Sequence, residues 1–354
     1  MKVKETLYLF NKYSNFLRFR IRIIITPLLV LICLSAKSQD IHFSQFYASP
    51  LIKNPADCGD FLGELRIADI YRTQWFTLPI PYVSNAISID KPIYIRKEHF
   101  GIGLVLINDK SGDAELTVSK LYLDLSYHKK IKRQYFHVGI QAGVVNKSIS
   151  LNAITFPDQY NRLTGFFDPS FPTSDATNGT TFYYPDMNAG IAWKGHFKVV
   201  EPEVGVSLYH INKPGENFFG TGNQLMIRKS YYSIVRIDLK GKLDLAPAIL
   251  FTEHALASEL VGGVNLIYMT GKETSAIQEI YGGLYSRNGL NRNFDAAIIQ
   301  CGLSLKHFDF GISYDLNVSD LSTATNNQGA IEFSVVYKKI SSLAFQKTIP
   351  CERY

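Results

Sequence analysis

The chain carries few residue patterns that could do chemistry. A nucleophile elbow of the G-x-S-x-G type presents a serine to a base, but Gly205-Val206-Ser207-Leu208-Tyr209 has tyrosine in place of the second glycine. The eight histidines are scattered, and no C-x-x-C or H-E-x-x-H motif supplies the spacing of a metal site. We therefore predict no catalytic residue, no metal and no cofactor. A hydrolase with its serine and histidine on separate strands is the less favoured alternative.

Three histidines fall on the polar faces of sequence runs that predict strands. His128, His137 and His307 each stand in a run where apolar residues occupy every second position. The inner wall of a membrane barrel needs polar groups, so we interpret these histidines as lumen-lining residues. A role as metal ligands is the alternative.

The elements that would position these residues are alternating runs. Apolar residues recur at every second position of residues 120–128, 136–144, 307–318 and 331–338, where Val336 is the exception. Each run has about ten residues, which suits a tilted strand that crosses a bilayer, whereas strands of a soluble β-sandwich average about 5–6 residues. These runs predict an all-β transmembrane antiparallel β-barrel, with the sandwich as the alternative.

Counting such runs gives the size of the barrel. An even number of strands returns both chain ends to the periplasm and places the long connections, 147–185, 211–230 and 318–327, at the outer end. Pro202 and Pro247 cannot donate to a ladder, so we expect them at a rim or a bulge. The barrel domain spans residues 64–339, and its 14 candidate strands lie near residues 65–76, 82–92, 99–108, 115–129, 134–146, 186–195, 197–210, 231–240, 242–252, 257–269, 277–286, 294–305, 307–317 and 328–338.

Residues 1–38 are typical of an export signal peptide. A basic start precedes an apolar run over residues 23–34, which is too short to span a bilayer, and Ala36-Lys37-Ser38 predicts cleavage after Ser38. A short membrane anchor is the alternative. This segment holds seven Lys or Arg and one Glu, so it carries the whole formal charge of +6. The remaining chain is neutral, which gives no argument for a nucleic-acid partner.

Residues 39–63 are aromatic but do not alternate. Pro50 and Pro55 remove backbone donors and block a regular strand or helix. Because an irregular backbone cannot face lipid, we expect this segment inside the barrel as a plug or at its rim, with a disordered leader as the alternative. The candidate plug or rim contacts are Phe43, Ser44, Gln45, Phe46, Tyr47, Pro50, Asn54 and Pro55.

Two cysteines flank the predicted barrel. Cys58 precedes the first strand and Cys351 follows the last, in the predicted periplasmic tail of residues 340–354. A closed barrel pairs its first and last strands, which brings both cysteines to one periplasmic rim, an oxidising environment. We hypothesise a Cys58–Cys351 disulfide. Cys301 alternates with leucines, so we expect it to face lipid.

The longest predicted loop, residues 147–185, is rich in aromatic residues and prolines. A loop that only contacts solvent does not need this composition, and loops of this length are often functional. We predict a lid over the barrel mouth that also contacts a partner. The candidate residues are Phe156, Asp158, Phe166, Phe167 and Phe171.

An ordered set of motifs spans nearly the whole chain after the signal. The first and most specific has the form D-x-x-F-S-Q-F-Y-x-x-P-L-x-x-N-P-A and occupies residues 40–56. The chain resembles the PorP/SprF family of outer-membrane proteins, which are associated with type IX secretion and gliding motility. The later motifs are Tyr71-Arg72-Thr73-Gln74-Trp75, Gly101-Ile102-Gly103-Leu104, Phe156-Pro157-Asp158-Gln159, Pro185-Asp186, Gly282-Gly283-Leu284-Tyr285, Gly311-Ile312-Ser313-Tyr314-Asp315 and Cys351-Glu352-Arg353-Tyr354.

The resemblance implies a non-enzymatic accessory of the secretion or gliding machinery in the cell outer membrane. It implies a periplasmic lipoprotein ring or a peptidoglycan-binding protein as partner, and a secreted adhesin whose export or surface attachment the barrel supports. Outer-membrane lipid would surround the barrel. The alternative is an outer-membrane channel or transporter for a small or hydrophobic solute.

Overall fold

The computed structural model describes residues 41–340, except 78, 113, 151–154, 169, 174–179, 219–221, 271–275, 291–293 and 320–321. The chain divides at residue 41, and the unit that begins there is described below. The predicted signal peptide and Cys351 lie outside the described residues.

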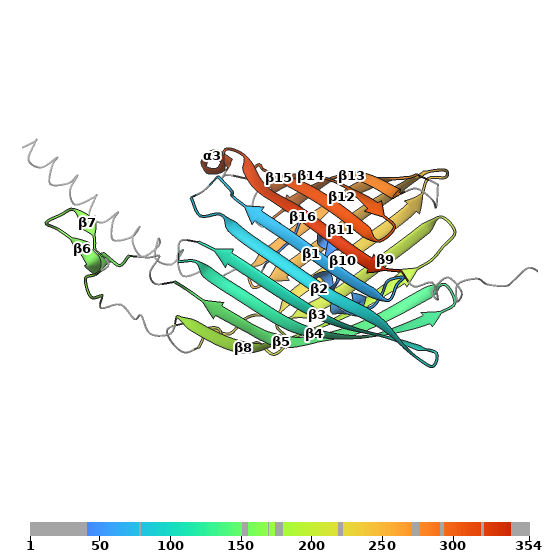
Figure 1. The fold of residues 1–354 in the computed structure, drawn as a ribbon, viewed down its shortest axis with the longest axis horizontal. Coiled ribbons are helices and arrows are strands. Elements are labelled where there is room, and N and C mark those ends of the chain that lie inside the picture. The colour runs from blue at the N-terminus through green and yellow to red at the C-terminus, as the bar shows by residue number, and fades with distance from the viewer. Residues whose placement is uncertain are drawn as a thin grey trace, which may run out of the picture. The chain divides into compact units, whose positions relative to one another are not determined.

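Fourteen strands close into one antiparallel barrel (Figure 1), which confirms the predicted fold. The register Leu65↔Lys339 to Gln74↔Ala330 joins the first strand to the last. The strands are β1(Leu65–Gln74), β2(Tyr82–Ile95), β3(Glu98–Ser111), β4(Leu116–Ile131), β5(Gln134–Ser148), β8(Thr181–Gly195), β9(Val200–Tyr209), β10(Arg228–Asp238), β11(Leu243–His254), β12(Ala257–Met269), β13(Ile277–Asn288), β14(Phe294–Leu305), β15(Phe308–Asn317) and β16(Gln328–Lys339).

The alternation of side chains gives the barrel an apolar outside and a polar inside. On β4, Leu121, Leu123 and Leu125 are exposed on the outer wall, whereas Tyr122 and Asp124 are buried toward the lumen. Strands of 10 to 16 residues are long enough to cross a bilayer at a tilt. No helix among the described parts of residues 41–340 is long and apolar enough to span a membrane.

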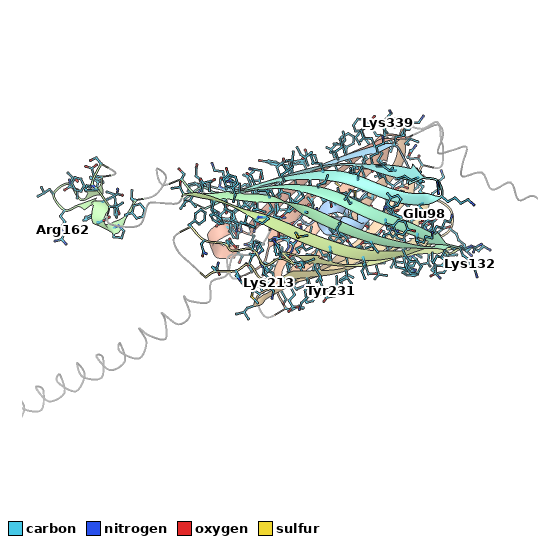
Figure 2. All side chains as sticks on the ribbon, turned by 90° about the horizontal axis from the view of Figure 1, so that it is seen from below. Glu98, Lys132, Arg162, Lys213, Tyr231 and Lys339 are labelled. Carbon is cyan, nitrogen blue, oxygen red and sulfur yellow. The ribbon has the colours of Figure 1, made fainter. Side chains whose placement is uncertain are left out.

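The three longest connections, β5 to β8, β9 to β10 and β15 to β16, all lie at one end of the barrel, as the sequence predicts, and most of the turns at the other end are short. Figure 2 shows Glu98, Lys132 and Lys339 toward the end with short turns, and Lys213 toward the opposite end. By the general rule for outer-membrane barrels, the short turns are periplasmic and the long loops are extracellular. The outer connections also contain η4(Pro157–Gln159), α3(Ser322–Thr325) and a separate two-stranded sheet, β6(Tyr160–Asn161) with β7(Phe166–Phe167).

The expectation for Pro247 is wrong. It lies inside β11, where it pairs in unbroken register with Val264 of β12, and no bulge occurs there. Toward β10 the ladder passes from Ile234↔Ala248 to Ile237↔Leu245 without a paired Pro247. The wall therefore accommodates the missing donor by interrupting one ladder locally, not by ending the strand.

The chain before β1 lies within the barrel, where Figure 1 shows the blue helical turns behind the strands. We call residues 41–63 the N-terminal segment. It contains η1(Phe46–Ala48), α2(Pro50–Lys53) and η2(Pro55–Asp57). The carbonyl of Ile41 accepts a hydrogen bond from Arg228, at the outer end of β10, and the N–H of Gly59 donates to Asp90, near the periplasmic end of β2. The segment therefore runs along the lumen from the outer end toward the periplasmic end.

Candidate functional site

The outer half of the N-terminal segment is held by a buried ion-pair cluster, which we call the outer anchor: Ser44, Arg72, Arg287, Asp315 and Glu332. The Ser44 hydroxyl donates to Asp315 at 2.8 Å and accepts from Arg287 at 2.6 Å and from Arg72 at 3.0 Å. The backbone N–H of Ser44 donates to Glu332 at 2.6 Å. Arg72 also bridges Glu332 and Asp315, at 2.5 and 3.1 Å.

The outer anchor links one residue of the segment to four strands of the wall. Arg72 lies on β1, Arg287 on β13, Asp315 on β15 and Glu332 on β16, and every one of these side chains is less than 7% exposed. Charges removed from water are tolerated only when they are paired and hydrogen-bonded. Loss of one member would leave an uncompensated buried charge, so the cluster fixes the position of Ser44.

Apolar and amide contacts extend the attachment on both sides of Ser44. Phe43 packs in a buried cluster with Ile70 and Val105, whereas Phe46 packs in a second cluster with Val261. The Gln45 side chain accepts a hydrogen bond from Ser334 at 2.8 Å and donates to Ser313 at 3.3 Å, and the Tyr47 ring meets Tyr281 edge-on. These rings and the apolar wall residues cover each other. Without the segment, the lumen side of the strands would expose that apolar surface to water.

A second charged cluster holds the middle of the segment; we call Lys53, Asp57, Lys194, Glu203 and Tyr232 the inner anchor. The Lys53 ammonium lies 3.0 Å from Asp57 and 2.6 Å from Glu203, and it sits 4.1 Å from the centre of the Tyr232 ring. The Tyr232 hydroxyl donates to Asp57 at 3.2 Å. Lys194 reaches Glu203 at 3.0 Å.

The irregular backbone of the segment finds its hydrogen-bond partners on the wall. The carbonyl of Lys53 accepts from the hydroxyls of Ser207 and Tyr209, at 3.1 and 2.7 Å. The Asn54 side chain donates to the carbonyl of Ile191 at 3.0 Å, and its oxygen accepts from the N–H of Ala56, which caps η2. Non-helical backbone can exist at membrane depth because protein groups satisfy it in this way.

Wall glycines allow the segment to approach the strands closely. A Cβ at Gly101 on β3 would overlap the carbonyl of Cys58, and one at Gly139 on β5 would overlap the carbonyl of Pro55. A Cβ at Gly190 on β8 would overlap the Asn54 side chain. Because these positions have no side chain, η2 and its flanking residues can lie directly against the wall backbone; we call Gly101, Gly139 and Gly190 the glycine seat.

The segment leaves the lumen through a third polar contact. Arg66 of β1 donates to both carboxylate oxygens of Asp90, at 2.9 and 2.7 Å, and to the carbonyl of Asp57 at 2.9 Å. Asp90 in turn accepts from the N–H of Gly59 at 2.7 Å. This bidentate pair is a strong, directional interaction and ties the end of the segment to the start of the barrel.

The structure brings together most of the residues that the sequence singled out in this segment. Phe43, Ser44, Gln45, Phe46, Asn54 and Pro55 are buried, and Tyr47 and Pro50 are partly buried. Sequence reasoning missed Lys53 and Asp57, although their i,i+4 spacing of opposite charges was a usable signal. It also did not connect Asp315 or Glu332 to Ser44.

The candidate loop residues lie around β6 and β7. The Gln159 side chain accepts from the N–H of Phe156 at 3.0 Å and donates to the carbonyl of Phe171 at 3.0 Å, which brings these two residues to one small structure. Phe166 is 75% exposed and Phe167 49% exposed. Asp158 is exposed as well. An exposed pair of adjacent phenylalanines is unusual on a surface that meets only water.

Cys58 is fully buried against the wall and has no disulfide partner among the described residues. Burial is the main reason that the pKa of this thiol is raised. Its hypothesised partner, Cys351, lies outside the described residues, so the disulfide stays a prediction. Cys301 on β14 is exposed on the outer wall, as the alternation indicates.

The alternating wall, the closed sheet and the internal segment define an outer-membrane β-barrel whose lumen contains its own N-terminal segment. The family model described as "Type IX secretion system membrane protein PorP/SprF" matches residues 35–337. The chain therefore belongs to the PorP/SprF family and is an outer-membrane protein.

The chain is similar to solved structures at low sequence identity. The toluene transporter TodX of Pseudomonas putida is 10% identical with a TM-score of 0.50, over 83% of this chain and 93% of that chain. The toluene transporter TbuX of Ralstonia pickettii is 8% identical with a TM-score of 0.47, over 83% and 94% of the two chains. BamA from Haemophilus ducreyi is 8% identical with a TM-score of 0.40, over 78% and 70%. No curated protein sequence matches the chain significantly.

Proposed function

We propose that this protein is a non-enzymatic outer-membrane component of the type IX secretion or gliding machinery. In this role it supports the export or surface attachment of an adhesin and links to a periplasmic lipoprotein ring or a peptidoglycan-binding protein. The N-terminal segment acts as a fixed plug. The observation that carries the proposal is the outer anchor, which joins Ser44 to four strands through buried charges inside a barrel of this family.

A plugged barrel favours an assembly role over a channel. The segment contacts β1, β13, β15 and β16 through the outer anchor, and β8, β9 and β10 through the inner anchor. A solute would have to displace these paired charges, which are costly to separate once buried. The interior space beside Tyr47 and Pro50 is a cavity of about 330 Å³ lined partly by Arg236 and Glu279. Arg236 and Glu279 in this lining are paired with each other at 2.8 Å.

The partner contacts belong to the two ends of the barrel. At the periplasmic end, Lys129 is paired with Glu98, whereas Lys130 and Lys132 are exposed beside it, so this turn offers positive charge to a periplasmic partner. Among the extracellular connections, Phe166 and Phe167 offer exposed apolar surface to a secreted adhesin. Hot spots of interfaces are commonly aromatic.

Affinity purification of the tagged protein from its own cells tests this function. We expect the wild type to co-purify with type IX secretion components and with one secreted adhesin. Replacing Phe166 and Phe167 together with Ser should lower adhesin recovery at least tenfold, because the apolar contact is lost, while barrel stability is unchanged.

The matched control is Leu163→Ser, a change on the same turn at a residue that is 96% exposed and adjoins the phenylalanines. If Leu163→Ser lowers recovery equally, the phenylalanines have no special role. If the wild type recovers neither machinery nor adhesin, and instead forms a steady open pore in bilayers, the assembly role is wrong and the channel alternative replaces it.

A further inference from the structure

Two histidines and a carboxylate converge where the N-terminal segment leaves the lumen. Asp60 of the segment, His128 of β4 and His137 of β5 each offer a ligand atom, and the three atoms all lie within 4.8 Å of one another. Both histidines are buried, and Asp60 is partly buried toward the periplasmic end. Asp60 and His137 lie far apart in the sequence, so no local motif reveals the group.

Hydrogen bonding fixes which nitrogen of His128 is available. Its Nε2 lies 2.8 Å from the carbonyl oxygen of Cys58, which can only accept, so Nε2 carries the proton and donates. Ser126 already donates its hydroxyl to the same carbonyl at 2.6 Å. A neutral His128 therefore presents the bare Nδ1 lone pair. A ring N–H held by a backbone carbonyl is the usual outer support of a metal-binding histidine.

His137 faces the same point with one nitrogen and leaves the other without a partner. Its Nδ1 lies 2.6 Å from Nδ1 of His128 and 3.9 Å from Oδ1 of Asp60. Its Nε2 is buried and has no hydrogen-bond partner among the described residues.

The carboxylate is oriented by a lysine. The Lys194 ammonium pairs with Oδ2 of Asp60, and the other oxygen, Oδ1, is the one on the side of His137. The same lysine reaches Glu203 of the inner anchor at 3.0 Å. Asp60 is thus held with one oxygen toward the two imidazoles, as a carboxylate ligand supported by a second residue would be.

We infer that Asp60, His128 and His137 form a site for a divalent transition-metal ion, with Zn²⁺ as the ion that this donor set suits. Two imidazole nitrogens and one carboxylate oxygen are a common zinc set that leaves a fourth position for water. The separations of 2.6 and 3.9 Å lie on either side of the roughly 3.4 Å between two ligands of a tetrahedral zinc ion.

The ion has a definite structural effect. It removes the Nδ1–Nδ1 contact, turns His137 into its Nε2–H tautomer and joins Asp60 of the segment to two neighbouring strands at the periplasmic end. The outer anchor already fixes the opposite end at Ser44. A metal here would therefore clamp the end of the segment nearest the periplasm, and this inference does not depend on any role in secretion.

Zinc titration of the purified full chain tests the site. Protein in detergent, stripped with EDTA, should bind one Zn²⁺ per chain by calorimetry and elemental analysis, and its thermal transition should rise. His137→Gln, which keeps a polar side chain, should weaken binding at least tenfold and abolish the thermal shift. His196→Ala is the matched control, because His196 is an exposed periplasmic-end histidine whose side chain is 52% exposed, and it should bind like the wild type.

A measurement on the unmodified protein covers the case in which His137→Gln does not fold. Co²⁺ added to the stripped wild type should give the intense visible absorption of a four-coordinate site, and Zn²⁺ should remove it. Substoichiometric zinc, equal binding by wild type and His137→Gln, or only the weak spectrum of hydrated Co²⁺ would each overturn the inference and identify any bound ion as adventitious.

Discussion

Ser44 shows how much one small residue decides inside this barrel. Its hydroxyl gives one hydrogen bond to Asp315 and takes two from Arg72 and Arg287, so three wall strands meet at one oxygen. A larger side chain would not fit a site that is completely buried, and an alanine would leave two guanidinium donors short of an acceptor. The buried wall charges therefore need the Ser44 hydroxyl as a hydrogen-bond partner, and the hydroxyl needs them in turn.

The outer anchor gives a prediction at this scale. Asp315→Asn removes the charge that two arginines share, so we expect a loss of about 3–5 kcal/mol in the free energy of unfolding. Denaturant unfolding in detergent micelles measures it. Asp309→Asn on the same strand is the control, because Asp309 makes a half-exposed pair with Lys338 and its loss should cost less than about 1 kcal/mol. Equal losses in the two variants would show that the outer anchor contributes no special stability.

At the scale of elements, η2 and the strands around it are sterically complementary. Pro55 lies against Gly139 of β5, and the side chain of Asn54, the N-cap residue of η2, lies against Gly190 of β8, where wall side chains would otherwise stand. The proline that prevents a regular strand also sets the first position of η2. The segment can remain irregular because side chains of the wall, and not a β-ladder, supply hydrogen-bond partners for its backbone.

Gly139→Ala tests this fit. Its Cβ would overlap the carbonyl of Pro55, so we expect a loss of about 1–3 kcal/mol and faster protease cleavage within residues 41–63. Gly282→Ala on β13 is matched, because a Cβ there has only a carbonyl oxygen at 4.0 Å as neighbour. Cleavage rates can be compared by mass spectrometry. If Gly139→Ala is as resistant as Gly282→Ala, the segment does not need the glycine seat.

Much of the barrel could be predicted from the sequence because strand alternation is local. The period of two along β4, β5, β15 and β16 assigns lipid and lumen faces without knowledge of the neighbours. The failures are tertiary. Pro247 lies in the middle of a strand because the pairing of β10 with β11 is interrupted around it. Ser44 and Asp315 are 271 positions apart, so their bond could not be inferred from spacing. Asp60 escaped notice for the same reason.

At the scale of the whole molecule, the described residues form a barrel whose lumen holds the chain's own N-terminal segment. The prolines and aromatic residues after the signal predicted an internal or rim segment, and hydrogen bonds of Ser44, Asn54 and Gly59 tie that segment to the wall. A barrel of fourteen strands without such a segment would enclose water. The central claim is that the segment keeps the lumen closed.

Single-channel conductance in planar bilayers tests that claim most directly. The wild type and a variant that lacks residues 41–57 would be compared, with heat-modifiable migration on gels as evidence that both barrels are folded. We predict that the wild type stays closed and that the deletion variant gives a steady ohmic current. A wild type that conducts as well as the deletion variant would contradict the account.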